Sequence, residues 1–125
     1  MKKFLFAIVC FLVVSLTVSA QRDGNRLSPE ESAKRMTERM TTELNLTPEQ
    51  VVPIDSINLV FAKAQAQLRE NANGDFASIR EDMRKLGALR LEAYEKILTD
   101  EQIQAYQKIM EERQRAGEER RRNNN

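Results

Sequence analysis

The pattern Leu-Thr-x-x-Gln occurs twice in this chain, and each copy carries a full set of signals for the start of an α-helix. The threonine hydroxyl accepts the backbone N–H of the glutamine, and the glutamine side chain in turn accepts the threonine N–H. The leucine before the cap contacts an apolar residue in the first turn. The motif residues are Leu46, Thr47, Gln50, Leu98, Thr99 and Gln102. The repeat predicts two similar helical-hairpin halves, each with a second helix that begins at a capped threonine.

Apolar residues recur every three or four positions in four segments, which is typical of amphipathic helices. The expected helices span residues 28–45, 47–71, 76–97 and 99–115. Gly74 is placed to end the second helix in a left-handed conformation, and Asp75 to cap the third. Gly87 lies inside the third helix at a cost of about 1 kcal/mol relative to alanine, which indicates a close helix crossing or a bend. The chain is therefore predicted to be all-α with four helices.

The composition argues against most catalytic, metal-binding and nucleic-acid-binding sites. The chain has no His and one Cys, so the usual transition-metal ligands and the usual base of nucleophilic catalysis are missing. Its paired acidic residues fall on expected exposed helix faces, away from the apolar pockets in which catalytic carboxyl groups lie. The 20 Lys and Arg residues are balanced by 19 Asp and Glu residues, so no basic field favours nucleic acid. We expect no enzyme, no cofactor and no bound metal.

Residues 1–20 have the organisation of a secretory signal peptide. Lys2 and Lys3 precede an apolar run from Phe4 to Val14, and small residues lead to Ala20. We expect cleavage after Ala20, export to the periplasm, and a mature chain without cysteine or a stable membrane anchor. The alternative is a retained anchor, but the apolar run is short for a membrane span of about 20 residues.

The mature chain is expected to form its helical domain over residues 28–115. Residues 21–27 are mostly polar, and residues 116–125 are charged residues and asparagines with hardly an apolar side chain. Such segments bury too little surface to offset the entropy of ordering, so we expect both to be disordered. The helical stripes are narrow, and a domain of this size buries only about two-thirds of its surface. We therefore expect self-association, most simply as a homodimer.

Three residues of the third helix are candidates for contact with a partner. Met83 has the adaptable side chain typical of permissive binding surfaces, although methionine at helical spacing more often belongs to a core. Arg84 belongs to a small basic run, which is either a solvated face or a patch that attracts acidic partners. Arg90 falls within the apolar stripe, where it either lies along the edge of the stripe or enters a concave surface.

Two such motifs in a small exported helical chain resemble the Spy/CpxP-like (LTxxQ-motif) periplasmic protein family. The resemblance covers roughly residues 28–115 and carries over only the six motif residues. It implies elongated, bent helices in a thin, cradle-like antiparallel dimer. It also implies either ATP-independent chaperone activity or an inhibitory role at an envelope-stress sensor kinase. Metal-sensing relatives use His-rich segments, which this chain lacks.

The function predicted from these features is that of an exported, holdase-type chaperone of the envelope stress response. It would bind unfolded or misfolded envelope proteins through shallow apolar contact, without ATP. One alternative is a regulatory partner of the periplasmic domain of a sensor kinase, and another is a passive structural helical protein. The six motif residues are expected to act as structural helix caps rather than to contact a ligand.

Overall fold

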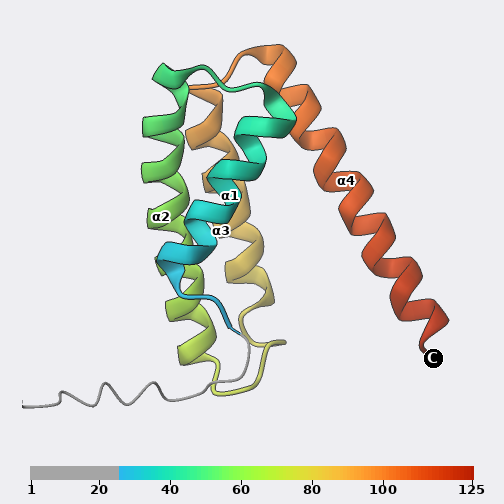
Figure 1. The fold of residues 1–125 in the computed structure, drawn as a ribbon. Helices are drawn as coiled ribbons and strands as arrows, with labels where there is room; N and C mark the ends of the chain where they lie inside the picture. Colours follow the sequence, from blue (N-terminus) through green and yellow to red (C-terminus); the bar gives the residue numbers. More distant parts are fainter. Residues whose placement is uncertain (1–25) are drawn as a thin grey trace, which may run out of the picture.

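The computed structural model describes residues 26–125, which form four α-helices and no strands (Figure 1). The helices are α1 (Pro29–Leu44), α2 (Pro48–Asn71), α3 (Arg80–Glu95) and α4 (Asp100–Asn123). The prediction of an all-α chain with four helices is confirmed. The expected signal peptide, residues 1–20, and residues 21–25 lie outside the described residues.

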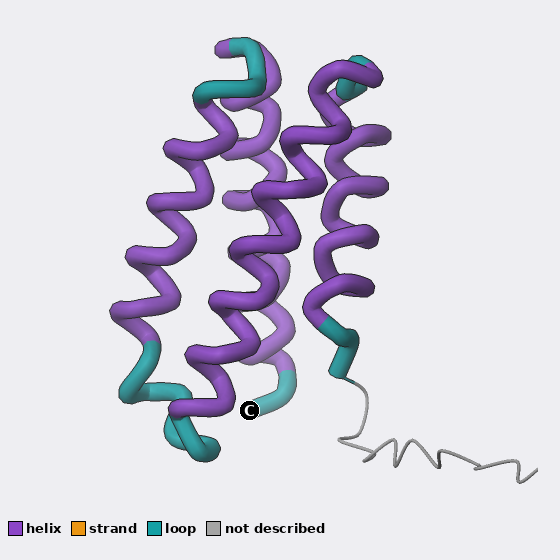
Figure 2. The backbone as a smooth tube through the Cα atoms, turned by 90° about the vertical axis from the view of Figure 1, so that its left-hand side faces the viewer, coloured by secondary structure: helices purple, strands orange, loops and turns teal. Residues whose placement is uncertain are grey.

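Three of the helices pack side by side, and the fourth diverges from them. α2 lies between α1 and α3, and consecutive helices run in opposite directions (Figure 2). The α1–α2 and α3–α4 connections lie at the same end of the molecule, which we call the junction end (Figure 1). α4 packs against α1 and α3 near this end and then turns away from them (Figure 1). The molecule is therefore closed at the junction end and open at the other.

Most buried apolar side chains gather near the junction end. The rings of Tyr94 and Tyr106 meet edge to face, with centroids 5.2 Å apart and planes at 82°. Such aromatic pairs stabilise a core beyond the area that they bury. The buried cluster consists of Met40, Leu44, Leu46, Ile54, Tyr94, Leu98 and Tyr106. It contains the leucine of both Leu-Thr-x-x-Gln motifs, so the two helix starts and the core are built together.

The third helix begins later than the sequence predicts, at Arg80 rather than at Phe76. Asp75 does accept backbone N–H groups, from Ala77 at 3.1 Å and Ser78 at 3.3 Å. These bonds close a short turn that competes with the helix, as acidic side chains often do. Phe76 is half exposed in this turn. The expectation that Asp75 caps a helix through residues 76–97 is therefore wrong.

Helix α4 continues to Asn123, so the prediction that residues 116–125 are disordered is wrong for most of them. Residues 116–125 are all exposed, so burial does not explain the helix. Local side-chain pairs support it, since Glu111 lies 4.0 Å from Arg115 and Gln114 donates to Glu118 at 3.3 Å. Arg120, the first of three arginines in the last turn, lies where positive charge favours the helix dipole. The end of the chain is solvated, as expected, but helical.

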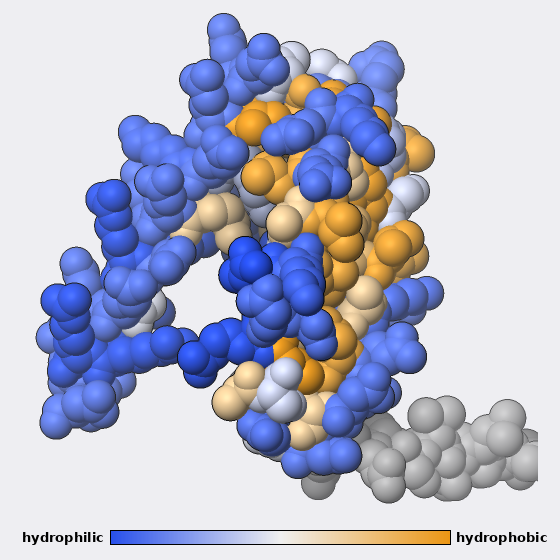
Figure 3. Space-filling model, turned by 180° about the vertical axis from the view of Figure 1, so that it is seen from behind, coloured by the Kyte–Doolittle hydropathy of each residue, from blue (hydrophilic) through white to orange (hydrophobic). Residues whose placement is uncertain are grey.

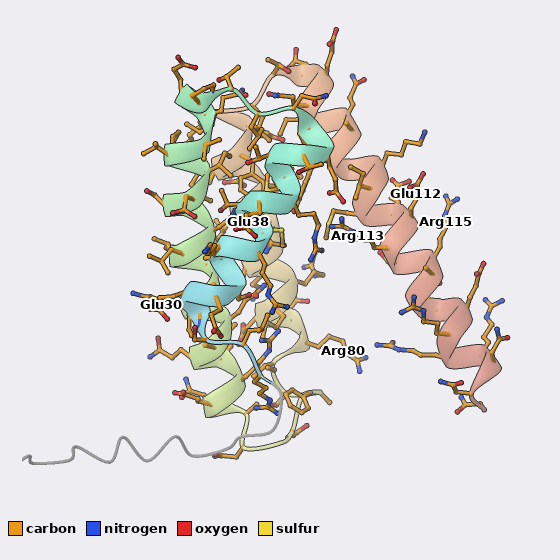
Figure 4. All side chains as sticks on the ribbon, in the orientation of Figure 1. Glu30, Glu38, Arg80, Glu112, Arg113 and Arg115 are labelled. Atoms are coloured by element: carbon orange, nitrogen blue, oxygen red, sulfur yellow. The ribbon has the colours of Figure 1, made fainter. Side chains whose placement is uncertain are left out.

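One ion pair links the diverging helix to α1. Arg113 of α4 points toward α1 (Figure 4), where its guanidinium pairs with the carboxylate of Glu43. Arg80 of α3 extends from the open end toward α4 (Figure 4). Because surface ion pairs contribute at most about 1 kcal/mol, the pair at Glu43 guides α4 but does not fix its position.

Candidate functional site

The two Leu-Thr-x-x-Gln motifs meet in space, which their sequence does not predict. The Nε2 atom of Gln50 donates to Oε1 of Gln102 at 2.8 Å, and the Nε2 atom of Gln102 donates to Oε1 of Gln50 at 3.0 Å. The two amides therefore form a reciprocal pair between the starts of α2 and α4. We call Gln50 and Gln102 the glutamine pair.

Each amide of the glutamine pair also donates a hydrogen bond at the C-terminal end of another helix. Gln50 donates to the carbonyl of Ile97, just after α3, and Gln102 donates to the carbonyl of Leu44, the last residue of α1, each at 3.2 Å. Each Oε1 atom accepts the N–H of its own N-cap threonine at 3.0 Å. An amide has two donors and two acceptor positions, so all of them are used. The motifs form the predicted helix caps and keep no free amide group for a ligand.

A buried polar chain crosses the three packed helices. The phenol of Tyr94 donates to the side-chain oxygen of Asn58, whose amide donates to the Thr37 hydroxyl at 3.0 Å. The hydroxyl oxygen of Thr37 also lies 2.9 Å from a carboxylate oxygen of Asp55. Burial raises the pKa of Tyr94 far above its ordinary value, and the nearby charge of Arg90 opposes this shift more weakly. Tyr94 is therefore a neutral donor at physiological pH.

These buried polar contacts were not expected, although the sequence pattern contains a signal for them. Asn58 lies four residues after Ile54, and Thr37 lies four residues after Ala33. Each polar residue therefore falls on the same helix face as an apolar core residue. Polar residues at core positions need partners, because an unpaired buried amide costs about 1–3 kcal/mol. Asn58 at such a position therefore signals a buried hydrogen-bond partner on another helix.

Apolar side chains line a strip along α2 and α3 on the surface. The strip shows as an orange band in the space-filling view from behind (Figure 3). Its two most exposed members are Val60 of α2, at 64%, and Leu89 of α3, at 54%. Four members surround a hollow of about 300 Å³ between the helices. The apolar strip is defined as Val60, Ala64, Leu68, Leu86 and Leu89.

Charged and polar residues border the apolar strip. Asp82 and Lys85 of α3 and Gln67 and Asn71 of α2 line the same hollow. A ligand that lies on the strip would meet apolar side chains first and opposite charges at the edge. Exposed apolar surface with a polar rim is typical of interaction sites.

The three candidate contact residues of α3 lie in different surroundings. Arg84 is exposed, and its guanidinium makes two hydrogen bonds to Glu81, at 3.0 and 2.7 Å. This contact raises the pKa of Arg84 and lowers the pKa of Glu81. Met83 is half buried, and Arg90 is half buried in a groove between α3 and α4. The structure does not bring the three residues together.

The described residues offer no arrangement that suggests a metal site or a membrane span. Across residues 26–125, no three side chains of His, Cys, Asp or Glu are placed to hold an ion. In the same part of the chain, no helix combines the length and the apolar character needed to cross a bilayer.

Comparison with known proteins identifies one family. The sequence profile of a family described as a domain of unknown function (DUF4890) matches residues 17–106. No curated protein and no solved structure matches the chain. The match covers both Leu-Thr-x-x-Gln motifs and all of α1, α2 and α3. The chain belongs to the DUF4890 family.

Proposed function

We propose that this protein is an exported, ATP-independent holdase-type chaperone that binds unfolded or misfolded proteins of the periplasm. The observation that carries the proposal is the apolar strip, where Val60 and Leu89 are more than half exposed. Unfolded chains expose apolar segments that folded proteins bury. The strip offers them a surface of matching character along two packed helices.

The shape of the strip favours weak and reversible binding. Burial of apolar area contributes about 25 cal/mol per Å², and association costs several kcal/mol of lost motional freedom. A shallow hollow of about 300 Å³ buries part of a bound segment, so the net affinity stays modest. The charges of Asp82 and Lys85 at the edge make binding depend on salt. Weak contact of this kind releases a client that folds, without a nucleotide.

The proposal is tested by the aggregation of a client protein. Purified residues 21–125 should slow the aggregation of a reduced or heated client at near-stoichiometric ratio, followed by light scattering. The double substitution Val60→Gln and Leu89→Gln should remove most of this effect, because it makes the exposed part of the strip polar. Circular dichroism should show unchanged helix content, since both side chains face solvent.

A matched control separates the strip from general surface hydrophobicity. Val52 is 71% exposed on the same helix as Val60 but does not belong to the strip. Val52→Gln should leave aggregation suppression unchanged. No suppression by the wild-type protein at large excess would contradict the chaperone proposal. Fixed-stoichiometry binding of a single envelope protein would instead favour the regulatory alternative.

The predicted homodimer is part of the same proposal. A strip with this exposure is a natural contact between two copies, and clients would then compete with the partner copy. Sedimentation of residues 21–125 should show a dimer whose dissociation increases when Val60 and Leu89 are replaced by glutamine. A protein that is monomeric at all concentrations would contradict the homodimer. The chaperone proposal would then be decided by the aggregation test alone.

A further inference from the structure

A second groove lies between α3 and α4, where α4 begins to diverge. It has a volume of about 430 Å³, within the range of small-ligand sites. Its apolar walls are Leu91 of α3 and Tyr106 and Met110 of α4. Gly87 and Arg90 of α3 also line it. None of these residues belongs to the apolar strip.

Arg90 is the unpaired charge of this groove. Its Nε atom is buried and has no hydrogen-bond partner among residues 26–125. In the same residues its guanidinium takes part in no ion pair, although the nearby Arg84 is paired with Glu81. An unsatisfied buried donor is costly, and more so when it is charged. A carboxylate is the ligand that matches a guanidinium best, because it accepts two parallel hydrogen bonds.

One acidic side chain lines the groove, but it does not pair with Arg90. Glu111 of α4 lines the groove with Arg90. Its carboxylate instead lies 4.0 Å from Arg115, one turn further along the same helix. The groove therefore presents a positive charge that this part of the chain leaves unmatched.

Gly87 provides independent evidence for free space in the groove. A β-carbon at Gly87 would meet no atom within 4 Å, so the close helix crossing, one of the two expected alternatives, is not present. Glycine inside a helix costs about 1 kcal/mol relative to alanine, and no neighbouring side chain explains that cost here. The missing side chain leaves space in the groove one turn from Arg90.

The apolar side chains that line the groove indicate which chemical group a ligand would carry beside its carboxylate. Leu91 and Met110 are half buried, and Tyr106 is nearly fully buried. These side chains suit a large apolar group, and the flexible thioether of Met110 can adjust to its shape. The groove is open to solvent along α4, which leaves room for the backbone of an extended peptide (Figure 3).

We infer that the α3–α4 groove binds a peptide segment in which an Asp or Glu side chain stands next to a large apolar side chain. The carboxylate pairs with Arg90, and the apolar group lies over Gly87 between Leu91 and Met110. This site gives the protein a preference among peptides that the uniform apolar strip does not have. It rests on the groove alone and does not depend on the strip.

The inference is tested with two labelled peptides that have blocked ends and differ only in Glu or Gln beside a Phe. Fluorescence anisotropy with residues 21–125 should show about tenfold tighter binding of the Glu peptide, as a charge-assisted pair predicts. Arg90→Gln should reduce the preference to less than about twofold. Gly87→Leu should weaken both peptides, because its side chain fills the space that the apolar group needs.

Matched controls separate the groove from general charge and from folding. Arg84→Gln removes the same charge from the same helix outside the groove and should keep the preference. Val60→Gln with Leu89→Gln should keep it too, even where aggregation suppression is lost. Equal affinity for the two peptides, or an equal loss of preference in Arg84→Gln, would overturn the inference. Binding of dodecanoate by the wild type but not by Arg90→Gln, with no binding of either peptide, would also overturn it, since the site would then be one for fatty acids.

Discussion

Single hydroxyl groups cap the starts of three of the four helices, at Ser28, Thr47 and Thr99. Thr47 and Thr99 each accept the N–H of the glutamine three residues later, at 3.3 and 3.2 Å. These bonds satisfy donors that a helix start otherwise leaves unpaired. Their effect is local, so the sequence alone predicts them.

Replacement of Thr47 by alanine should lower stability without removing binding. The loss of an N-cap hydroxyl costs about 1 kcal/mol, which lowers Tm by roughly 4–8 °C in a domain of this size. Thermal unfolding followed by circular dichroism measures the change. Thr42→Ala is the control, because Thr42 is exposed inside α1 and bonds only the carbonyl of Glu38. An unchanged Tm for Thr47→Ala would show that the cap does not stabilise α2.

Replacement of Tyr94 by phenylalanine should destabilise the protein through Asn58. The change removes the donor to the buried side-chain oxygen of Asn58, which costs about 1–3 kcal/mol. Urea unfolding at neutral pH measures the difference. Tyr106→Phe is the control, since it keeps the edge-to-face ring contact and the Tyr106 hydroxyl donates no hydrogen bond among residues 26–125.

The same substitution has an expected pH dependence. The folded protein raises the pKa of Tyr94, so the stabilisation is complete below the ordinary tyrosine pKa of about 10. As the pH rises above this value, the unfolded chain releases a proton that the folded chain retains, and stability falls. The difference between wild type and Tyr94→Phe should therefore shrink above about pH 10. A difference that grows with pH would contradict the assignment of Tyr94 as a neutral donor.

At the scale of the helix, α3 carries a glycine that the fold does not need. Gly87→Ala should raise the free energy of unfolding by about 1 kcal/mol, because the added methyl group meets no neighbour and alanine favours the helix. Urea unfolding measures it. Gly74→Ala is the opposite case, since Gly74 has a φ of +91° that other residues rarely adopt, and it should be destabilising. Destabilisation by Gly87→Ala would show that α3 needs the glycine for packing.

The ends of the helices separate what local sequence predicts from what it does not. The Ser28 and Thr47 caps are confirmed, because each depends on residues three apart in the chain. The predicted start of α3 is wrong because Asp75 can either cap a helix or close a turn, and the same local sequence is compatible with both. Helix α4 is longer than predicted because local side-chain contacts and the arginines of its last turn support it without buried residues.

At the scale of the whole molecule, the glutamine pair joins the ends of all four helices. The sequence predicts each cap separately, but the contact between Gln50 and Gln102 depends on how the two hairpins are placed. A double-mutant cycle with alanine at both positions should give a coupling energy of about 0.5–3 kcal/mol in urea unfolding. Additive single effects would show that the two caps act independently.

The open end of the molecule follows from the same arrangement. The buried cluster and the glutamine pair both lie near the junction end, while Val60 and Leu89 remain exposed along the packed helices. Sequence periodicity predicts narrow stripes but not which of their members stay exposed, because burial depends on how the helices pack against one another. The resemblance to the Spy/CpxP-like family remains a prediction.

The most direct test of the account is photo-crosslinking from the apolar strip. A photoreactive phenylalanine analogue at Leu89 should capture several unrelated unfolded chains, and it should no longer capture the same chains when they are added after they have folded. The same analogue at Ala105, which is exposed on α4, should capture far fewer. Adducts that form equally at both positions, or only with a second copy of the protein, would contradict the claim that the strip binds unfolded proteins.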